Sequence, residues 1–216
     1  MNIEQARFNM IEQQIRPWNV LDQDVLDMLI VVKREDYFPE NQKSLAFFDT
    51  ELPLLSGVMA LTPKIEARIL QELSVKKQES VLLVGAGNGY LAALLGHCAR
   101  QVTVMEAIPE IKALAEDNLN KNGIFNVDVE WGDALLAKNA GTFDVIVVSG
   151  SLENIPEQLQ QQLAIGGRLF VIVGKNPVME AQIITRESEL FFNTKKIFET
   201  SVPPLSQAIP ASTFTF

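Results

Sequence analysis

The first part of the chain places apolar residues at helical spacing, interrupted by prolines. Helices are predicted over residues 3–16, 22–33 and 63–73. Pro17 separates the first two, Asp22 suits the N-cap of the second, and Pro63 suits the first position of the third. The residues between them, 38–63, are rich in loop signals. This region is therefore predicted to form a helical unit ahead of the main fold.

From residue 80 the pattern changes to short apolar runs that alternate with helical stretches. The predicted strands are SVLLVG (80–85), QVTVME (101–106), NVDVEWG (126–132), FDVIVVS (143–149) and GRLFVIVG (167–174). The predicted helices that follow cover 89–98, 109–122 and 155–165. Such alternation indicates an α/β fold in which crossover helices join parallel strands. Two later runs, 180–186 and 190–200, have no helix between them, so we expect an antiparallel pair at the end of the sheet.

Composition narrows the class of protein. The 216 residues suit one domain, and a 47% apolar content is that of a folded protein. The net charge of −9 argues against nucleic acid as a partner, because phosphate binding needs a basic face. A single cysteine, Cys98, fits a reducing compartment. The N-terminus lacks the pattern of a signal peptide, and no apolar run reaches the roughly 18 residues of a membrane span. We expect a soluble cytoplasmic protein with no membrane partner.

The stretch VLLVGAGNGY (81–90) places alternating glycines directly after a strand and before a helix. There a ligand can approach bare backbone beside a helix N-terminus. The dinucleotide fingerprint GxGxxG would require glycine at position 90, where this chain has Tyr90. The spacing therefore favours S-adenosylmethionine, with a tight turn that binds nothing as the alternative.

Two acidic residues support an adenosine-sized site. Glu106 ends the second strand, where a carboxylate can accept from both ribose hydroxyls, and Asp133 follows the third strand, within reach of an adenine amino group. Each position alone is also compatible with a solvent-facing acid or an ordinary turn. The predicted cofactor-binding residues are Gly85, Ala86, Gly87, Gly89, Tyr90, Glu106, Ala107, Gly132, Asp133 and Ala134.

With these residues in place, the chain resembles the protein-L-isoaspartate O-methyltransferase family from about residue 8 to about residue 205. KREDYFP (33–39) is similar to the family's Pro-Arg-His-x-Phe-Val-Pro, and FFDTELPL (47–54) to its Ala-Tyr-x-Asp-x-x-Leu-Pro-Ile. VLLVGAGNGYLAALLG (81–96) resembles Val-Leu-Glu-Ile-Gly-Thr-Gly-Ser-Gly-Tyr-Gln-Ala-Ala-Val-Leu-Ala. IPEQLQQQLAIGGRLFVIVG (155–174) is similar to Ile-Pro-x-x-Leu-x-x-Gln-Leu-x-x-Gly-Gly.

The resemblance implies a Rossmann-like class I methyltransferase fold: a mostly parallel seven-stranded sheet with an antiparallel end strand and an N-terminal helical cap. It implies S-adenosylmethionine as cofactor and a carboxylate of damaged protein as methyl acceptor. We expect a single domain, with cap and substrate loop over 1–79, cofactor-binding core over 80–205 and a tail over 206–216. The tail, with its Phe214-Thr-Phe216 alternation, is expected to form an edge strand, dock into an apolar groove or stay partly ordered.

Two positions depart from the family pattern. The family reads Gly-Gln-Thr-Ile-Ser-x-Pro before the third cap helix, with the serine as its catalytic hydroxyl. Here Leu61 stands in its place, with Val58 and Met59 also apolar. Met59, Leu61 and Thr62 are the predicted substrate-loop residues, and the adjacent Thr62 is the candidate hydroxyl. An apolar loop of this kind also suits a small, less polar acceptor.

The second departure is Leu83, where the family has a glutamate that helps to hold the methionine end of the cofactor. Losing a charged hydrogen-bond partner costs about 1.5–3 kcal/mol, which weakens binding roughly tenfold to a hundredfold. On this reasoning Leu83→Glu should tighten cofactor binding.

The remaining candidates for chemistry are few. His97 and Cys98 are expected to be surface or packing residues, and one histidine with one cysteine cannot build an ordinary metal site. Arg16, beside Trp18, could pair with a substrate carboxylate or be a solvated arginine at a helix end.

Two hypotheses follow. One is an S-adenosylmethionine-dependent methyltransferase of the isoaspartyl-repair type, and the other is a non-catalytic descendant that keeps the fold. A dinucleotide oxidoreductase is a distant third, because Tyr90 breaks the fingerprint.

Overall fold

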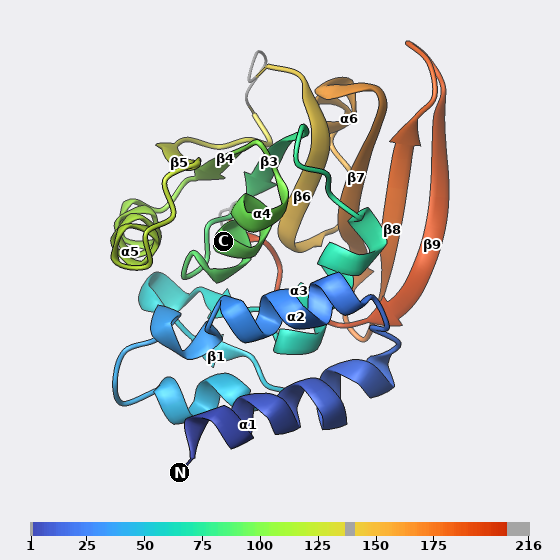
Figure 1. Ribbon diagram of the computed structural model, residues 1–216. Helices are drawn as coiled ribbons and strands as arrows, with labels where there is room; N and C mark the ends of the chain where they lie inside the picture. The colour runs from blue at the N-terminus through green and yellow to red at the C-terminus, as the bar shows by residue number, and fades with distance from the viewer. Residues whose placement is uncertain (1, 137–140, 207–216) are drawn as a thin grey trace, which may run out of the picture.

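The computed structural model describes residues 2–136 and 141–206, and a seven-stranded sheet forms its centre (Figure 1). The strands are β3 (Ser80–Val84), β4 (Gln101–Glu106), β5 (Val127–Trp131), β6 (Phe143–Leu152), β7 (Leu163–Lys175), β8 (Val178–Arg186) and β9 (Phe192–Thr200). Their order across the sheet is β5-β4-β3-β6-β7-β8-β9. The first five run parallel, and β8 is antiparallel to both of its neighbours.

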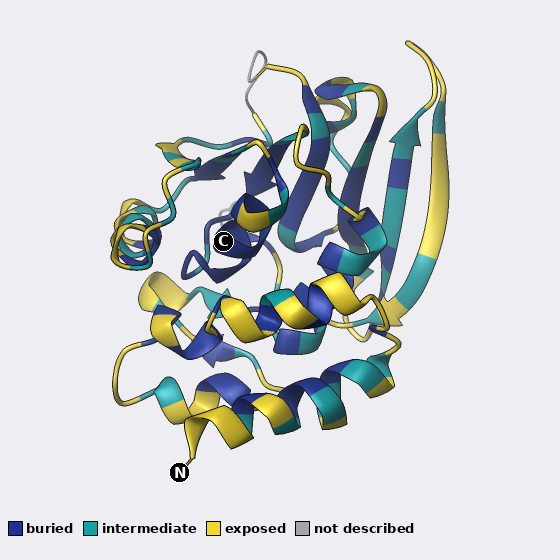
Figure 2. Cartoon of the chain, viewed as in Figure 1, coloured by how far each residue is buried: buried dark blue, intermediate teal, exposed yellow. Residues whose placement is uncertain are grey.

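Apolar side chains fill both faces of the sheet. Because side chains alternate along a strand, Val81 and Leu83 join one apolar cluster while Leu82 and Val84 join another. The first cluster includes residues of α3 (Pro63–Leu73), α4 (Tyr90–Cys98), α5 (Pro109–Lys121) and the N-terminal helices. The second includes a residue of the short α6 (Glu157–Gln161). Figure 2 shows the buried central strands and the largely exposed β9.

Most of the cap, residues 2–79, lies across the edge of the sheet where the parallel strands end, and residues 74–79 lead to the opposite edge, where β3 begins (Figure 1). It contains α1 (Ile3–Met10), α2 (Gln23–Val31), α3 and a two-stranded ribbon of β1 (Leu52–Pro53) and β2 (Met59–Ala60). As predicted, the Asp22 side chain caps α2 by accepting from the N–H of Asp24, and α3 begins at Pro63. The chain after α1 continues through a π-helical turn, Ile11–Ile15, and a 3₁₀ turn, Arg16–Trp18.

The sequence predicted the parallel strands, the crossover helices and the antiparallel pair correctly, but one helix is shorter than expected. The predicted helix over 155–165 ends at Gln161, and β7 begins at Leu163, which pairs with Phe143. Leu159 and Leu163 are both fully buried and four residues apart, so their spacing imitates a continuing helix. The N–H of Phe143 instead donates to the carbonyl of Gln162 (2.9 Å), which draws this segment into the sheet.

Two further findings concern the chain as a whole. Within residues 2–136 and 141–206, no helix is both long enough and apolar enough to cross a membrane. The predicted tail lies, apart from Ser206, outside the described residues.

Candidate active site

A cavity of about 130 Å³ lies where the cap meets the ends of β3 and β4. Three segments line it: residues 57–61 of the cap, residues 85–88 after β3 and residues 203–206 after β9. Four further residues complete it: Glu66, Leu91, Glu106 and Ser149. A single water needs only about 10–15 Å³, so the cavity has room for a larger molecule.

The glycine loop presents open backbone to this cavity. Gly85, Gly87 and Gly89 have φ of 90°, 55° and 88°, a left-handed conformation that residues with a Cβ rarely adopt. A Cβ on Gly85 would lie 2.3 Å from the Ser149 Oγ, whereas a Cβ on Gly87 would meet nothing within 4 Å. The turn therefore needs glycine for its conformation, and at Gly87 the free space is available to a ligand.

Glu106 is fixed against the same loop. Its side chain is buried, with one oxygen accepting from the N–H of Ala86 (2.8 Å) and the other from the N–H of Ile108 (2.9 Å). Each carboxylate oxygen can accept more than one hydrogen bond, so both retain capacity toward the cavity. The carboxylate thus joins the loop after β3 to the end of β4 and leaves acceptors for a pair of hydroxyls.

A second carboxylate, Glu66 of α3, also lines the cavity and is 3% exposed. Its Oε2 accepts from the Nε of Arg34 (2.8 Å), and both side chains of this ion pair are buried. Burial raises the pKa of the Glu66 carboxyl, and the adjacent Arg34 guanidinium opposes that rise. The cavity is therefore bounded by two buried acids from different elements.

Arg34 also fixes the ribbon that forms the cap side of the cavity. Its Nη2 donates to the carbonyl of Leu61 (2.6 Å) and its Nη1 to the carbonyl of Ala46 (2.7 Å). The guanidinium lies over the rings of Phe38 and Tyr90 as well, with its central carbon 4.9 and 5.8 Å from their centroids. A single buried arginine thus connects α3, the substrate-loop segment and the glycine-loop helix.

The segment after β9 supplies the third wall. The carbonyl of Pro203 accepts from the N–H of Ser151, whose carbonyl accepts from the N–H of Leu205, both at 3.0 Å. A Cβ on Gly150 would lie 2.7 Å from the backbone of Leu205, so glycine allows this segment to pack closely on β6. Ser149, just before it, donates to the carbonyls of Val84 and Gly85.

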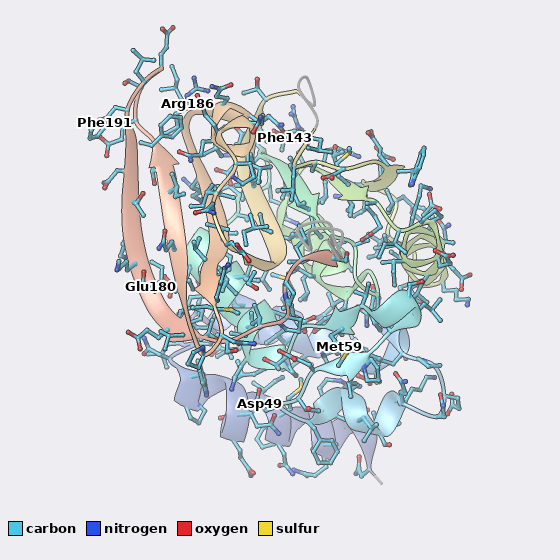
Figure 3. The ribbon with its side chains drawn as sticks, turned by 180° about the vertical axis from the view of Figure 1, so that it is seen from behind. Asp49, Met59, Phe143, Glu180, Arg186 and Phe191 are labelled. Atoms are coloured by element: carbon cyan, nitrogen blue, oxygen red, sulfur yellow. The ribbon has the colours of Figure 1, made fainter. Side chains whose placement is uncertain are left out.

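The structure brings several predicted site residues together at the cavity. Gly85, Ala86, Gly87 and Glu106 of the predicted cofactor set line it, as do Met59 and Leu61 of the predicted substrate loop. Figure 3 labels Met59 at the junction of the cap and the sheet. Thr62 is not among the lining residues, and its Oγ1 is buried without a hydrogen-bond partner in the described structure.

Other predicted cofactor residues lie behind or beside the lining. Tyr90 is 1% exposed and donates its hydroxyl to the carbonyl of Val32 (3.3 Å), so it joins the cap to α4. The N–H of Gly132 donates to the carbonyl of Glu106, and an Asp133 oxygen accepts from the N–H of Leu135. Gly89, Ala107 and Ala134 likewise do not line the cavity.

Leu83 is fully buried in the apolar cluster on the cap side of the sheet and is not among the cavity-lining residues. Arg16 pairs with Glu12 one helical turn away, and Trp18 lies beneath the Lys64 ammonium, 4.0 Å from its ring centroid. His97 is exposed on α4.

His97 and Cys98, which the sequence predicts to be surface or packing residues, do not have the features of catalytic groups. Burial raises the pKa of the Cys98 thiol to about 11, and burial together with nearby Lys77 lowers the pKa of His97. No group of three or more His, Cys, Asp or Glu side chains in residues 2–136 and 141–206 is arranged to hold a metal ion.

Sequence reasoning missed the lining residues that belong to no motif. Glu66, Leu91 and Ser149 and residues 203–206 are separated along the chain and meet only in the fold. Asn88 lies inside the glycine stretch, where the motif itself specifies only the glycines. Its side chain accepts from the N–H of Tyr90 and donates to the carbonyl of Tyr37. An acid on the apolar face of a predicted helix was the one available signal for Glu66.

Comparison with known proteins points to one family. Residues 5–208 match the family model of protein-L-isoaspartate(D-aspartate) O-methyltransferase. A protein-L-isoaspartate O-methyltransferase 2 of Marinobacter nauticus is 34% identical over 206 residues, 94% of each chain. A protein-L-isoaspartate O-methyltransferase of Koribacter versatilis is 35% identical and matches over 92% of this chain and 90% of its own.

Among solved structures, this chain is similar to one from Plasmodium falciparum that is described as a protein-L-isoaspartate O-methyltransferase in complex with S-adenosyl-L-homocysteine. The TM-score is 0.79 at 21% identity, and the match covers 96% of this chain and 99% of that one. At this identity the likeness shows the fold. The family match spans the cap, the glycine loop and the cavity, and the chain belongs to the protein-L-isoaspartate(D-aspartate) O-methyltransferase family.

Proposed function

We propose that this protein transfers a methyl group from S-adenosylmethionine to the carboxylate of isoaspartyl residues in damaged protein. One observation carries the proposal: a single cavity is lined by residues 85–87 of the glycine loop, by Glu106 and by the cap segment 57–61. The first two suit an adenosine ligand, and the third lies where the family's substrate loop is expected. The relatives that match nearly the whole chain carry the same activity in their names.

The residues present fit the cofactor. The left-handed turn at Gly87 leaves open space at its surface, and both Glu106 oxygens can accept from ribose hydroxyls. We expect the adenine to bind near Asp133, with Ala107 and residues 132–134 as the predicted residues around it. Residues 203–206 form a further wall of the cavity.

S-adenosylmethionine supplies a methyl group on a positively charged sulfur. The work left to the protein is positioning and exclusion of water, because this transfer is an in-line displacement. A carboxylate acceptor is already an anion at neutral pH and needs no general base. Among the described residues that line the cavity none is histidine, lysine or cysteine, and a base-free transfer suits that lining.

We expect the acceptor carboxylate to enter along the cap segment 57–61. Met59 and Leu61 make this wall apolar. Arg34 Nη2 donates to the Leu61 carbonyl (2.6 Å), so the segment presents a fixed surface. Such a surface desolvates a bound carboxylate, which makes the anion a better nucleophile. Thr62, the candidate hydroxyl from the sequence, lies outside the cavity lining with its Oγ1 buried, so we expect transfer to proceed without it.

The test uses two peptides that are identical except that one carries isoaspartate where the other carries aspartate. The full chain is incubated with methyl-labelled S-adenosylmethionine and each peptide, and transferred label is counted. We expect label only in the isoaspartyl peptide, released by mild base as methyl esters are. Cofactor binding without transfer to either peptide would contradict the proposal and favour the non-catalytic alternative.

A further inference from the structure

Two buried carboxylates line the cavity, but their hydrogen bonding differs. Both Glu106 oxygens accept from backbone N–H groups, which tie the carboxylate to the glycine loop. Glu66 uses only Oε2, which accepts from Arg34, and Oε1 accepts no hydrogen bond from any described residue. Glu66 therefore has an unused acceptor in a side chain that lines the cavity.

The position of Glu66 is fixed by its partner. Arg34 is 1% exposed, and besides Glu66 it donates from Nη1 to the carbonyl of Ala46 and from Nη2 to the carbonyl of Leu61. Three partners from different elements fix the orientation of the guanidinium, and it makes its hydrogen bond to Oε2 of Glu66. Oε1 is not among the fully buried side-chain atoms without a partner, and Glu66 lines the cavity, so this oxygen is accessible to a ligand there.

The ligand proposed above presents a matching group. S-adenosylmethionine carries a ribose diol in its nucleoside half and an α-ammonium group in its amino-acid half. Glu106 suits the diol, so the amino-acid half points toward the rest of the cavity. Among the described lining residues, Glu66 is the other ionisable side chain there.

We propose that Glu66 binds the α-ammonium group of the cofactor through its free oxygen. The assignment rests on the proposed use of S-adenosylmethionine. It revises the expectation that Leu83 leaves the amino-acid end without a carboxylate. Leu83 packs in the apolar cluster instead, and the acid comes from α3 rather than from β3.

The experiment compares two ligands by calorimetry: S-adenosylhomocysteine and its deaminated analogue, which lacks only the α-amino group. The wild-type chain should prefer S-adenosylhomocysteine by roughly tenfold to a hundredfold, because a charge-assisted hydrogen bond is lost with the amine. Glu66→Gln keeps an acceptor for Arg34 and removes the charge. This variant should bind the two ligands within about threefold of each other.

Glu106→Gln serves as the matched control, because the diol is present in both ligands. It should weaken both to the same degree and keep the preference for the amine. Equal binding of the two ligands by the wild-type chain would overturn the role of Glu66. This outcome is measured on the wild-type chain alone, so it does not depend on whether a variant folds. An undiminished preference in Glu66→Gln would overturn it as well. If the wild-type chain binds neither ligand, the proposed cofactor fails, and the role of Glu66 fails with it.

Discussion

Arg34→Met removes the buried guanidinium and keeps an apolar side chain in its place. The change strands the Glu66 carboxylate and the carbonyls of Ala46 and Leu61, which accept from Arg34 at 2.8, 2.7 and 2.6 Å. Breaking a buried ion pair on one side costs about 3–5 kcal/mol. Each stranded carbonyl adds about 1–3 kcal/mol where water cannot reach it. We expect a loss of at least about 3 kcal/mol, a large share of a typical stability of about 5–15 kcal/mol.

The assay is urea unfolding followed by circular dichroism, without ligand, with the slope against urea checked for constancy. Arg16→Met is the matched control: its pair with Glu12 leaves both side chains 36% exposed, so the expected loss is about 0–1 kcal/mol. Adding Glu66→Leu to Arg34→Met should recover stability, since the carboxylate is no longer stranded. Equal losses for Arg34→Met and Arg16→Met would refute the reasoning.

Three further changes test other parts of the structure. Gly150→Ala drives a Cβ to within 2.7 Å of the Leu205 backbone and should weaken S-adenosylhomocysteine binding by about tenfold, measured by calorimetry; unchanged affinity would mean that this wall does not contact the ligand. Thr62→Val is isosteric and should leave methyl transfer within about twofold; a large drop in rate would make the hydroxyl catalytic. Hydrogen bonds from the Ser80 N–H and hydroxyl lower the pKa of Asp144, so its contribution to stability is lost as pH falls through its depressed folded-state pKa. The urea concentration at the unfolding midpoint should therefore fall when the pH is lowered below about 4, and it should fall less in Asp144→Asn than in the wild type. Parallel plots of midpoint against pH for the two proteins would contradict this.

The sheet could be predicted from the sequence because each central strand is a short, continuous apolar run that ends at a polar residue or glycine. Val81 to Val84 are buried on both faces, which is the pattern that a central parallel strand requires. The end of the helix near Gln161 could not be predicted, because a buried Leu163 four residues after the buried Leu159 fits a helical spacing as well as a strand. Its pairing with Phe143, 20 residues away along the chain, decides the outcome.

The candidate site divides in the same way. Gly85, Gly87 and Glu106 were predicted because each follows a strand at a fixed place, and the fold brings strand ends together. Glu66 and Leu205 have no such local pattern. Glu66 sits mid-helix among apolar residues, and Leu205 reaches the cavity through backbone bonds to Ser151. Side chains placed by tertiary packing alone carry little signal in a single sequence.

A crystal structure of the full chain with S-adenosylhomocysteine tests the central claim most directly. We expect the ligand in the cavity lined by residues 57–61, 85–88 and 203–206, with its ribose on Glu106 and its ammonium group on Glu66. A ligand bound elsewhere, such as in the surface groove lined by Tyr37, Pro53 and Lys121, would contradict the account.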